Sequence, residues 1–80
     1  MNVPAVRKLV ENYTISILQE AEWNLIEGKE MNISVGGKDE GEQFTHITAA
    51  IWILENMRMR NVEFNEALLE YTKQLREPIN

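Results

Sequence analysis

His46 is the chain's only histidine and the first side chain to consider for chemistry. It follows Glu42 by four positions, so on one helix the two side chains face a common point. With Thr45 beside them, they form a candidate small-ligand or catalytic site. An imidazole acts as a general base only where a substrate or nucleophile lies within hydrogen-bonding reach. The plainer interpretation, which we favour, is a polar residue near a helix start that is hydrogen-bonded to Glu42 or Thr45.

Metal and cofactor chemistry has little support in the sequence. The chain has no cysteine, and a single histidine cannot supply the nitrogen and sulfur ligands of a zinc site. Gly36, Gly37 and Lys38 precede a helix start, but a phosphate-binding loop needs a longer glycine spacing and a Lys-Ser or Lys-Thr pair. The acidic residues that follow would repel phosphate. We therefore expect no metal and no cofactor, and we favour a non-enzymatic role.

The overall charge argues against nucleic acid as a partner. Thirteen acidic and eight basic side chains give a formal net charge of −5, which repels a phosphate backbone. Basic residues near the ends of two consecutive predicted helices could still cluster. They leave weak nucleic-acid binding as a third hypothesis, and they are Arg58, Arg60, Lys73 and Arg76.

The sequence also predicts a compartment. The most apolar run, Ile47 to Leu54, is far shorter than the roughly 18 residues that a membrane-spanning helix needs. The first residues lack the basic start and unbroken apolar stretch of a signal peptide. The absence of cysteine fits a reducing environment. We expect a cytoplasmic protein without membrane association.

Helical periodicity and capping signals predict an all-α fold, a compact bundle of four helices in a single domain over residues 1–80. Thr14 is a predicted N-cap, Gly28 a stop signal, and Asp39 with Glu42 a capping box. The predicted helices run from about Pro4 to Asn12, Ile15 to Glu27, Glu40 to Arg60 and Phe64 to Arg76.

The segment between the second and third helices has a different pattern. Met31, Ile33 and Val35 alternate with Asn32 and Ser34, which is the period of a strand. No second strand pattern is present to pair with it. The segment is therefore either an irregular or short extended loop, which we favour, or an edge that pairs with a second copy of the chain.

The third predicted helix is apolar on nearly every side, unlike the other three. Such a helix is normally buried all round, which makes it the central helix of the bundle. The alternative is that one face stays exposed for a protein partner or a second copy in a homodimer. Tryptophan and methionine are enriched at such surfaces. The candidate interface residues are Trp23, Trp52, Ile53, Met57 and Met59.

Three stretches carry a resemblance to known sequences. They are Val3 to Tyr13, Asp39 to Gln43 with Thr45 and His46, and Ala49 to Leu54. Together they resemble a small bacterial family of helical proteins of unknown function, over nearly the whole chain. The resemblance implies no activity, cofactor or catalytic residue. The leading hypothesis remains a protein-protein interaction or self-associating module.

Overall fold

The computed structural model describes residues 1–75 and confirms the all-α fold class. No strand occurs within those residues. The first helix begins one residue earlier than predicted, and the second ends one residue earlier. The helices are α1 (Val3–Asn12), α2 (Ile15–Ile26), α3 (Glu40–Arg60) and α4 (Phe64–Leu75).

Local side-chain hydrogen bonds explain where the helices begin and end. The first three helices each start after a residue whose side chain accepts a hydrogen bond from a backbone N–H three positions later. These caps are Asn2, Thr14 and Asp39, of which Asn2 is absent from the predicted set. After α2, Gly28 has φ +72°, and after α3, Asn61 has φ 55°. Both residues adopt the left-handed conformation that ends helices.

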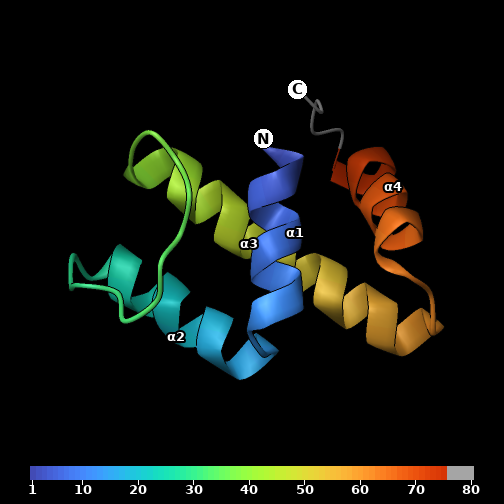
Figure 1. Ribbon diagram of the computed structural model, residues 1–80, viewed down its shortest axis with the longest axis horizontal. Coiled ribbons are helices and arrows are strands. Elements are labelled where there is room, and N and C mark those ends of the chain that lie inside the picture. The colour runs from blue at the N-terminus through green and yellow to red at the C-terminus, as the bar shows by residue number, and fades with distance from the viewer. Residues whose placement is uncertain (76–80) are drawn as a thin grey trace.

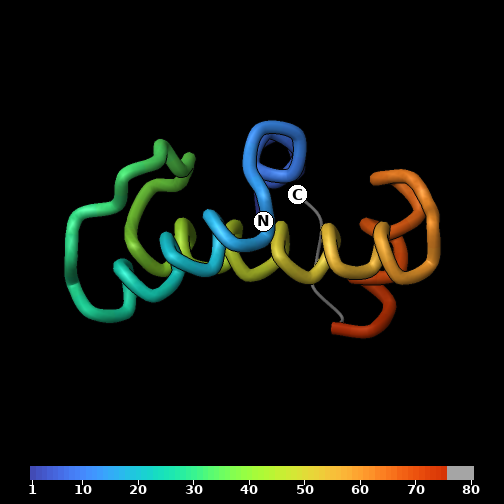
Figure 2. Tube along the Cα trace, turned by 90° about the horizontal axis from the view of Figure 1, so that it is seen from below, coloured from blue at the N-terminus to red at the C-terminus, as the bar shows by residue number. Residues whose placement is uncertain are grey.

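Helix α3 is the centre of the fold, and each of the other helices packs against it. Figure 1 shows α1 crossing α3, with α2 beside the N-terminal half of α3 and α4 beside its C-terminal half. Figure 2 shows α1 on one side of a layer that contains the other helices. The molecule is correspondingly thin, at 33 × 25 × 18 Å. The predicted central position of the third helix is confirmed.

The core forms where α1, α2 and α4 meet α3. Two alanines in the middle of α3, Ala49 and Ala50, are fully buried, so neighbouring helices can approach the α3 backbone closely. The side of α3 that faces away from α1 is only partly covered by the described residues. We call this side the open stripe. Its residues are Gly41, Phe44, Thr48, Trp52, Glu55 and Met59.

The segment between α2 and α3 is an extended loop that packs against the core. Met31, Ile33 and Val35 are partly buried, whereas Asn32 and Ser34 are exposed. The alternation therefore reflects a chain that turns every second side chain inward without pairing as a strand. The favoured loop interpretation is confirmed. No helix within residues 1–75 has the length and apolar character needed to cross a membrane.

Candidate functional site

His46 points from α3 into the protein, and its side chain is fully buried. Its Nε2 accepts a hydrogen bond from the backbone N–H of Asn2 at 3.1 Å. Its Nδ1 lies 2.6 Å from the carbonyl oxygen of Gly36 and donates to it. These two partners together require the neutral tautomer with its proton on Nδ1. The predicted partners Glu42 and Thr45 are wrong, because His46 instead joins two distant backbone segments.

Glu42 and Thr45 form local hydrogen bonds on the helix surface. Glu42 Oε1 accepts from the backbone N–H of Lys38 at 2.9 Å, and Thr45 Oγ1 donates to the Gly41 carbonyl at 3.0 Å. Neither side chain is bonded to His46, so the three predicted ligand-site residues do not converge. Within residues 1–75, no group of three or more His, Asp or Glu side chains is placed to hold a metal ion.

The five candidate interface residues lie in different environments. Trp23 on α2 and Met59 on α3 are strongly exposed, with relative exposures of 60% and 86%. Trp52 is partly buried and packs edge-on against Tyr71, with ring centroids 5.5 Å apart. Ile53 is fully buried in the core, because one position along a helix turns the side chain by about 100°, out of the open stripe. Met57 is partly buried against the core, away from the open stripe.

The open stripe therefore contains two of the five predicted residues, Trp52 and Met59. Phe44 also belongs to it and is 36% exposed. A shallow hollow of about 210 Å³ lies beside Trp52 and Met59 and is also lined by Glu55 and Asn56. These four residues have the i, i+3, i+4, i+7 spacing of a hole that receives a side chain from a facing helix. Sequence reasoning did not include Phe44 among the interface residues. Phe44 precedes Trp52 by eight positions, about two helical turns, so the spacing alone places both on the same side of α3.

The two ends of α3 carry opposite charges. Glu40 and Glu42 lie in its first turn, and Arg58 and Arg60 lie in its last turn. Glu40 and Arg58 are eighteen positions apart, about five turns at about 3.6 residues per turn, so they lie on the same flank. Glu42 and Arg60 have the same separation and lie on the other flank. Each flank of the open stripe is therefore acidic at the N-terminal end of α3 and basic at its C-terminal end.

The basic residues proposed for nucleic-acid binding are interspersed with acidic ones. Arg60 Nη1 lies 4.0 Å from Glu70 Oε2. The hydrogen bond from Gln74 lowers the pKa of Glu70, and the charges of Arg60 and Lys73 add to the effect. Arg58 points away from this group, since two positions along a helix turn a side chain by about 200°. Arg76 lies outside the described residues.

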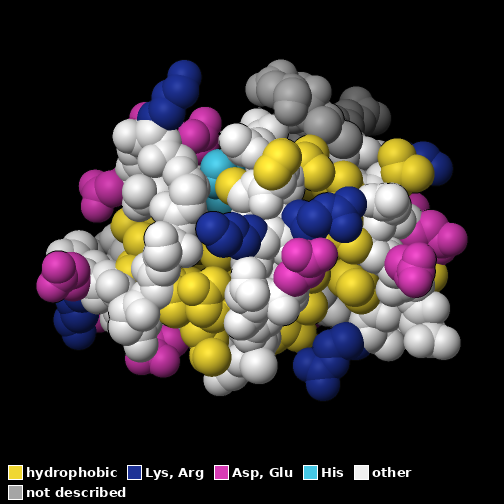
Figure 3. Space-filling model, in the orientation of Figure 1, with side chains coloured by type: hydrophobic (Ala, Val, Ile, Leu, Met, Phe, Trp, Pro, Cys, Tyr) yellow, Lys and Arg dark blue, Asp and Glu magenta, His cyan; other side chains and the backbone are white. Residues whose placement is uncertain are grey.

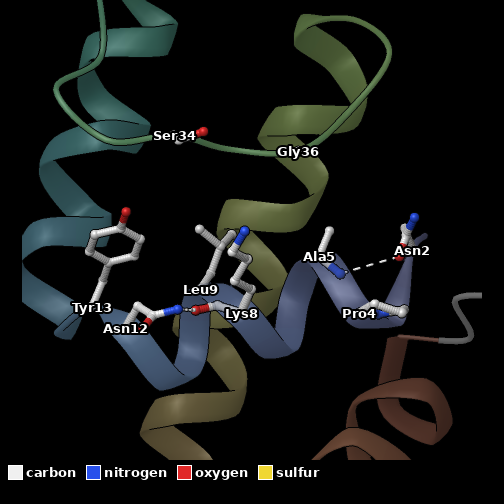
Figure 4. Close-up of a pocket in the computed structure, with 9 residues that line it drawn as sticks. All are labelled: Asn2, Pro4, Ala5, Lys8, Leu9, Asn12, Tyr13, Ser34 and Gly36. Atoms are coloured by element: carbon white, nitrogen blue, oxygen red, sulfur yellow. Dashed lines mark hydrogen bonds between the residues drawn. The ribbon is translucent and has the colours of Figure 1, made fainter.

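A second feature is a groove of about 330 Å³ between α1 and the loop before α3. Figure 4 shows its residues: one face of α1 forms one wall, and Ser34 and Gly36 form the other. Figure 3 shows lysine and arginine side chains gathered at the centre of this face of the molecule. Sequence reasoning missed the groove, because it depends on how the loop packs against α1. The α1 residues that line it are Asn2, Pro4, Ala5, Lys8, Leu9, Asn12 and Tyr13.

Comparison with known proteins gives one match. The model of a family of unknown function, DUF6952, matches residues 1–80. The chain belongs to this family. No curated protein and no solved structure matches it. The resemblance to a family of unknown function is confirmed, and any role of the DUF6952 chain has to be argued from its own residues.

The DUF6952 chain thus offers two surfaces on opposite faces of the molecule. The open stripe of α3 lies on the face away from α1, and the groove lies beside α1. The stripe combines large apolar side chains with charged flanks, which suits contact with a protein. The groove is concave and small, which suits contact with a small molecule.

Proposed function

We propose that this protein is a non-enzymatic, self-associating module in which two copies pair through the open stripe of α3. Phe44, Trp52 and Met59 bring three large apolar side chains to this stripe, and all remain accessible to solvent. Exposed large apolar side chains that gather on one face are a feature of protein-protein contacts. Phenylalanine, tryptophan and methionine are also the residue types enriched in them.

The observation that carries the proposal is the order of large and small residues along the stripe. In an antiparallel pair with its two-fold axis near position 50, Trp52 faces Thr48 of the second copy. Met59 then faces Gly41 of the second copy, which has no side chain. Trp52 and Met59 each meet a smaller residue, and the symmetry repeats both contacts. Antiparallel self-complementarity of this kind is what a two-fold interface requires.

The same register places Phe44 over the hollow beside Trp52 of the second copy. In this register position 44 lies opposite Asn56, one of the four residues that line the hollow. The volume of the hollow, about 210 Å³, is large enough for a phenyl ring. The contact is a knob in a four-residue hole, as in coiled coils. The two-fold axis generates it twice, once at each end of the stripe.

Charge complementarity favours the antiparallel orientation over the parallel one. In an antiparallel pair, the two-fold axis lies in the interface and is perpendicular to the two helices. It places each flank of α3 beside the same flank of the second copy, with the two chains running in opposite directions. Glu40 then approaches Arg58 of the second copy, and Glu42 approaches Arg60. A parallel pair would bring glutamates against glutamates and arginines against arginines. Such complementarity mainly sets orientation and specificity, because exposed ion pairs contribute little free energy.

The size of the face is compatible with a stable dimer. The molecule measures 33 Å by 25 Å across its two longer axes, which sets an upper limit of roughly 800 Å² per copy, and the open stripe occupies only part of that face. Typical stable interfaces bury about that area per partner. We therefore expect a dimer of moderate affinity that dissociates on dilution.

The first test compares two glutamate substitutions by sedimentation velocity from micromolar to millimolar protein concentration. We expect a wild-type dimer and a monomeric Met59→Glu variant, because the substitution places a charge against Gly41 of the second copy. Leu69→Glu is the matched control, since Leu69 is 56% exposed and lies on the side of α4 opposite its buried face. It should dimerise like the wild type. A wild-type protein that is monomeric at all concentrations, or a dimer that tolerates Met59→Glu, would overturn the proposal.

A charge exchange tests the orientation of the two helices. Glu40 and Arg58 are both exposed on α3, so neither substitution disturbs the core. We expect Glu40→Arg and Arg58→Glu each to weaken the dimer at low salt, and the double variant to restore it. In a parallel dimer, neither single substitution would weaken the dimer by breaking a pair of opposite charges. Restoration in the double variant thus supports the antiparallel pair, and its absence contradicts it.

A further inference from the structure

The groove beside α1 is lined by one lysine, Lys8. Lys8 is exposed on α1 and forms no ion pair and no side-chain hydrogen bond with any residue of the described range 1–75. Its neighbour Arg7, by contrast, contacts Glu11 and Asn65. In Figure 4 the side chain of Lys8 rises from α1 toward the loop segment that carries Ser34 and Gly36. The ammonium group therefore stands at the rim of the groove, where it is exposed to solvent.

The rest of the groove combines an apolar floor with a few polar groups. Ala5, which is partly buried, and Leu9, which is 2% exposed, lie at the base of the groove, and the ring of Tyr13 closes one end. The hydroxyl of Tyr13 is directed toward the loop, on the same side of α1 as Lys8. Ser34 adds a hydroxyl to the opposite wall. Small-molecule sites are usually lined mostly by apolar side chains, with a few polar groups that fix the orientation of the ligand.

The buried side chain of His46 connects the two walls of the groove. His46 accepts from the N–H of Asn2 on one wall and donates to the carbonyl of Gly36 on the other. Gly36 also approaches α1 closely, since a Cβ built on it would lie 3.4 Å from the Cβ of Ala5. The spacing of the walls is therefore fixed before any ligand arrives. A preformed site spends less binding free energy on ordering itself.

We propose that this groove binds a small organic carboxylate. The apolar body of the ligand lies against the Tyr13 ring, beside Leu9, and its carboxylate pairs with the ammonium of Lys8. The Tyr13 hydroxyl donates a second hydrogen bond to the carboxylate. The groove volume of about 330 Å³ is near the lower end of ligand pockets, which suits a body of one or two rings. The groove lies on the face away from the open stripe, so binding does not depend on dimer formation.

The test uses 2-naphthoate as the probe and 2-naphthamide as its uncharged counterpart of the same shape. Titration of the full-length protein is followed by backbone amide chemical shifts in two-dimensional NMR. We expect 2-naphthoate to shift the amides of Ala5, Leu9 and Gly36, and 2-naphthamide to bind about tenfold more weakly because it cannot form a charge-assisted pair. Equal affinities for the two compounds, or shifts confined to other surfaces, would overturn the proposal.

Two lysine substitutions separate a local contact from a general charge effect. Lys8→Met removes the groove cation, whereas Lys29→Met removes a cation that lies outside the groove and is paired with Glu27. We expect Lys8→Met to weaken 2-naphthoate binding by about tenfold and to leave 2-naphthamide unchanged. Lys29→Met should change neither compound's affinity. An equal loss in both variants would mean that overall charge attracts the probe, and it would refute the site.

Discussion

The substitution His46→Phe tests whether the buried imidazole connects α1 and the loop to α3. Phenylalanine retains a ring at the position but can neither accept from the N–H of Asn2 nor donate to the carbonyl of Gly36. Each unsatisfied backbone group costs about 1–3 kcal/mol. Asn2 and Gly36 are exposed as residues and the two hydrogen bonds are only partly buried, so we take the cost of each group near the lower limit. We expect a total loss of about 2 kcal/mol of unfolding free energy.

Urea unfolding monitored by tryptophan fluorescence measures this loss. With a slope of about 1 kcal/mol per molar urea for a small protein, the midpoint should fall by about 2 M. Thr45→Ala is the control, since its hydroxyl bonds only to the carbonyl of Gly41 one turn earlier. All variants are compared at one protein concentration, because dimer formation adds to apparent stability.

The amide protons give a local readout of the same substitution. In His46→Phe, the N–H of Asn2 and those of the loop around Gly36 should exchange with solvent faster than in the wild type, while those in the middle of α4 should not. A variant with the wild-type midpoint and unchanged exchange at Asn2 would refute the structural role of His46. Faster exchange throughout the chain would mean that the core itself depends on the imidazole.

Two further predictions concern the contacts of α4. Arg7→Met should lower the free energy of unfolding by about 1 kcal/mol, as measured by urea unfolding. The substitution removes a guanidinium 4.4 Å from the centroid of the Phe64 ring and a 3.0 Å hydrogen bond to Asn65. An unchanged free energy of unfolding would contradict this. The pKa of Glu70 lies below its ordinary value of 4.5, chiefly through the hydrogen bond from Gln74, so its ionised form stabilises the protein at neutral pH and this contribution is lost as the pH falls through the lowered pKa. We therefore expect Glu70→Gln to be less stable than the wild type at pH 7, with the difference vanishing in acid well below pH 4.5; a difference that persists in acid would have another cause.

The helices were predictable because their signals are local. Thr14 and Asp39 accept hydrogen bonds from N–H groups only three residues away, and Gly28 takes the left-handed conformation that its missing side chain permits. The Met31 to Val35 alternation also reported correctly which side chains turn inward. It could not distinguish a strand from an extended loop, because that distinction depends on a pairing partner.

The partners of His46 were not predictable in the same way. Asn2 is forty-four positions away and Gly36 is ten, so both contacts exist only after α1 and the loop have packed on α3. The open stripe was partly predictable. Because α3 is apolar nearly all round, its sequence does not indicate which arc the other helices leave accessible. The adjacent residues Trp52 and Ile53 are only about 100° apart around the helix, yet one is partly exposed and the other is buried.

The packing of α1, α2 and α4 on one shared helix has a consequence for how the native state fluctuates. Since α2 contacts the N-terminal half of α3 and α4 the C-terminal half, detachment of α4 leaves the contacts of α2 intact. We therefore expect the detachment of α4 from α3 to cost less free energy than global unfolding. Protection from hydrogen exchange should be highest in the middle of α3, around Ala49 and Ala50, and should fall toward the helices at either side.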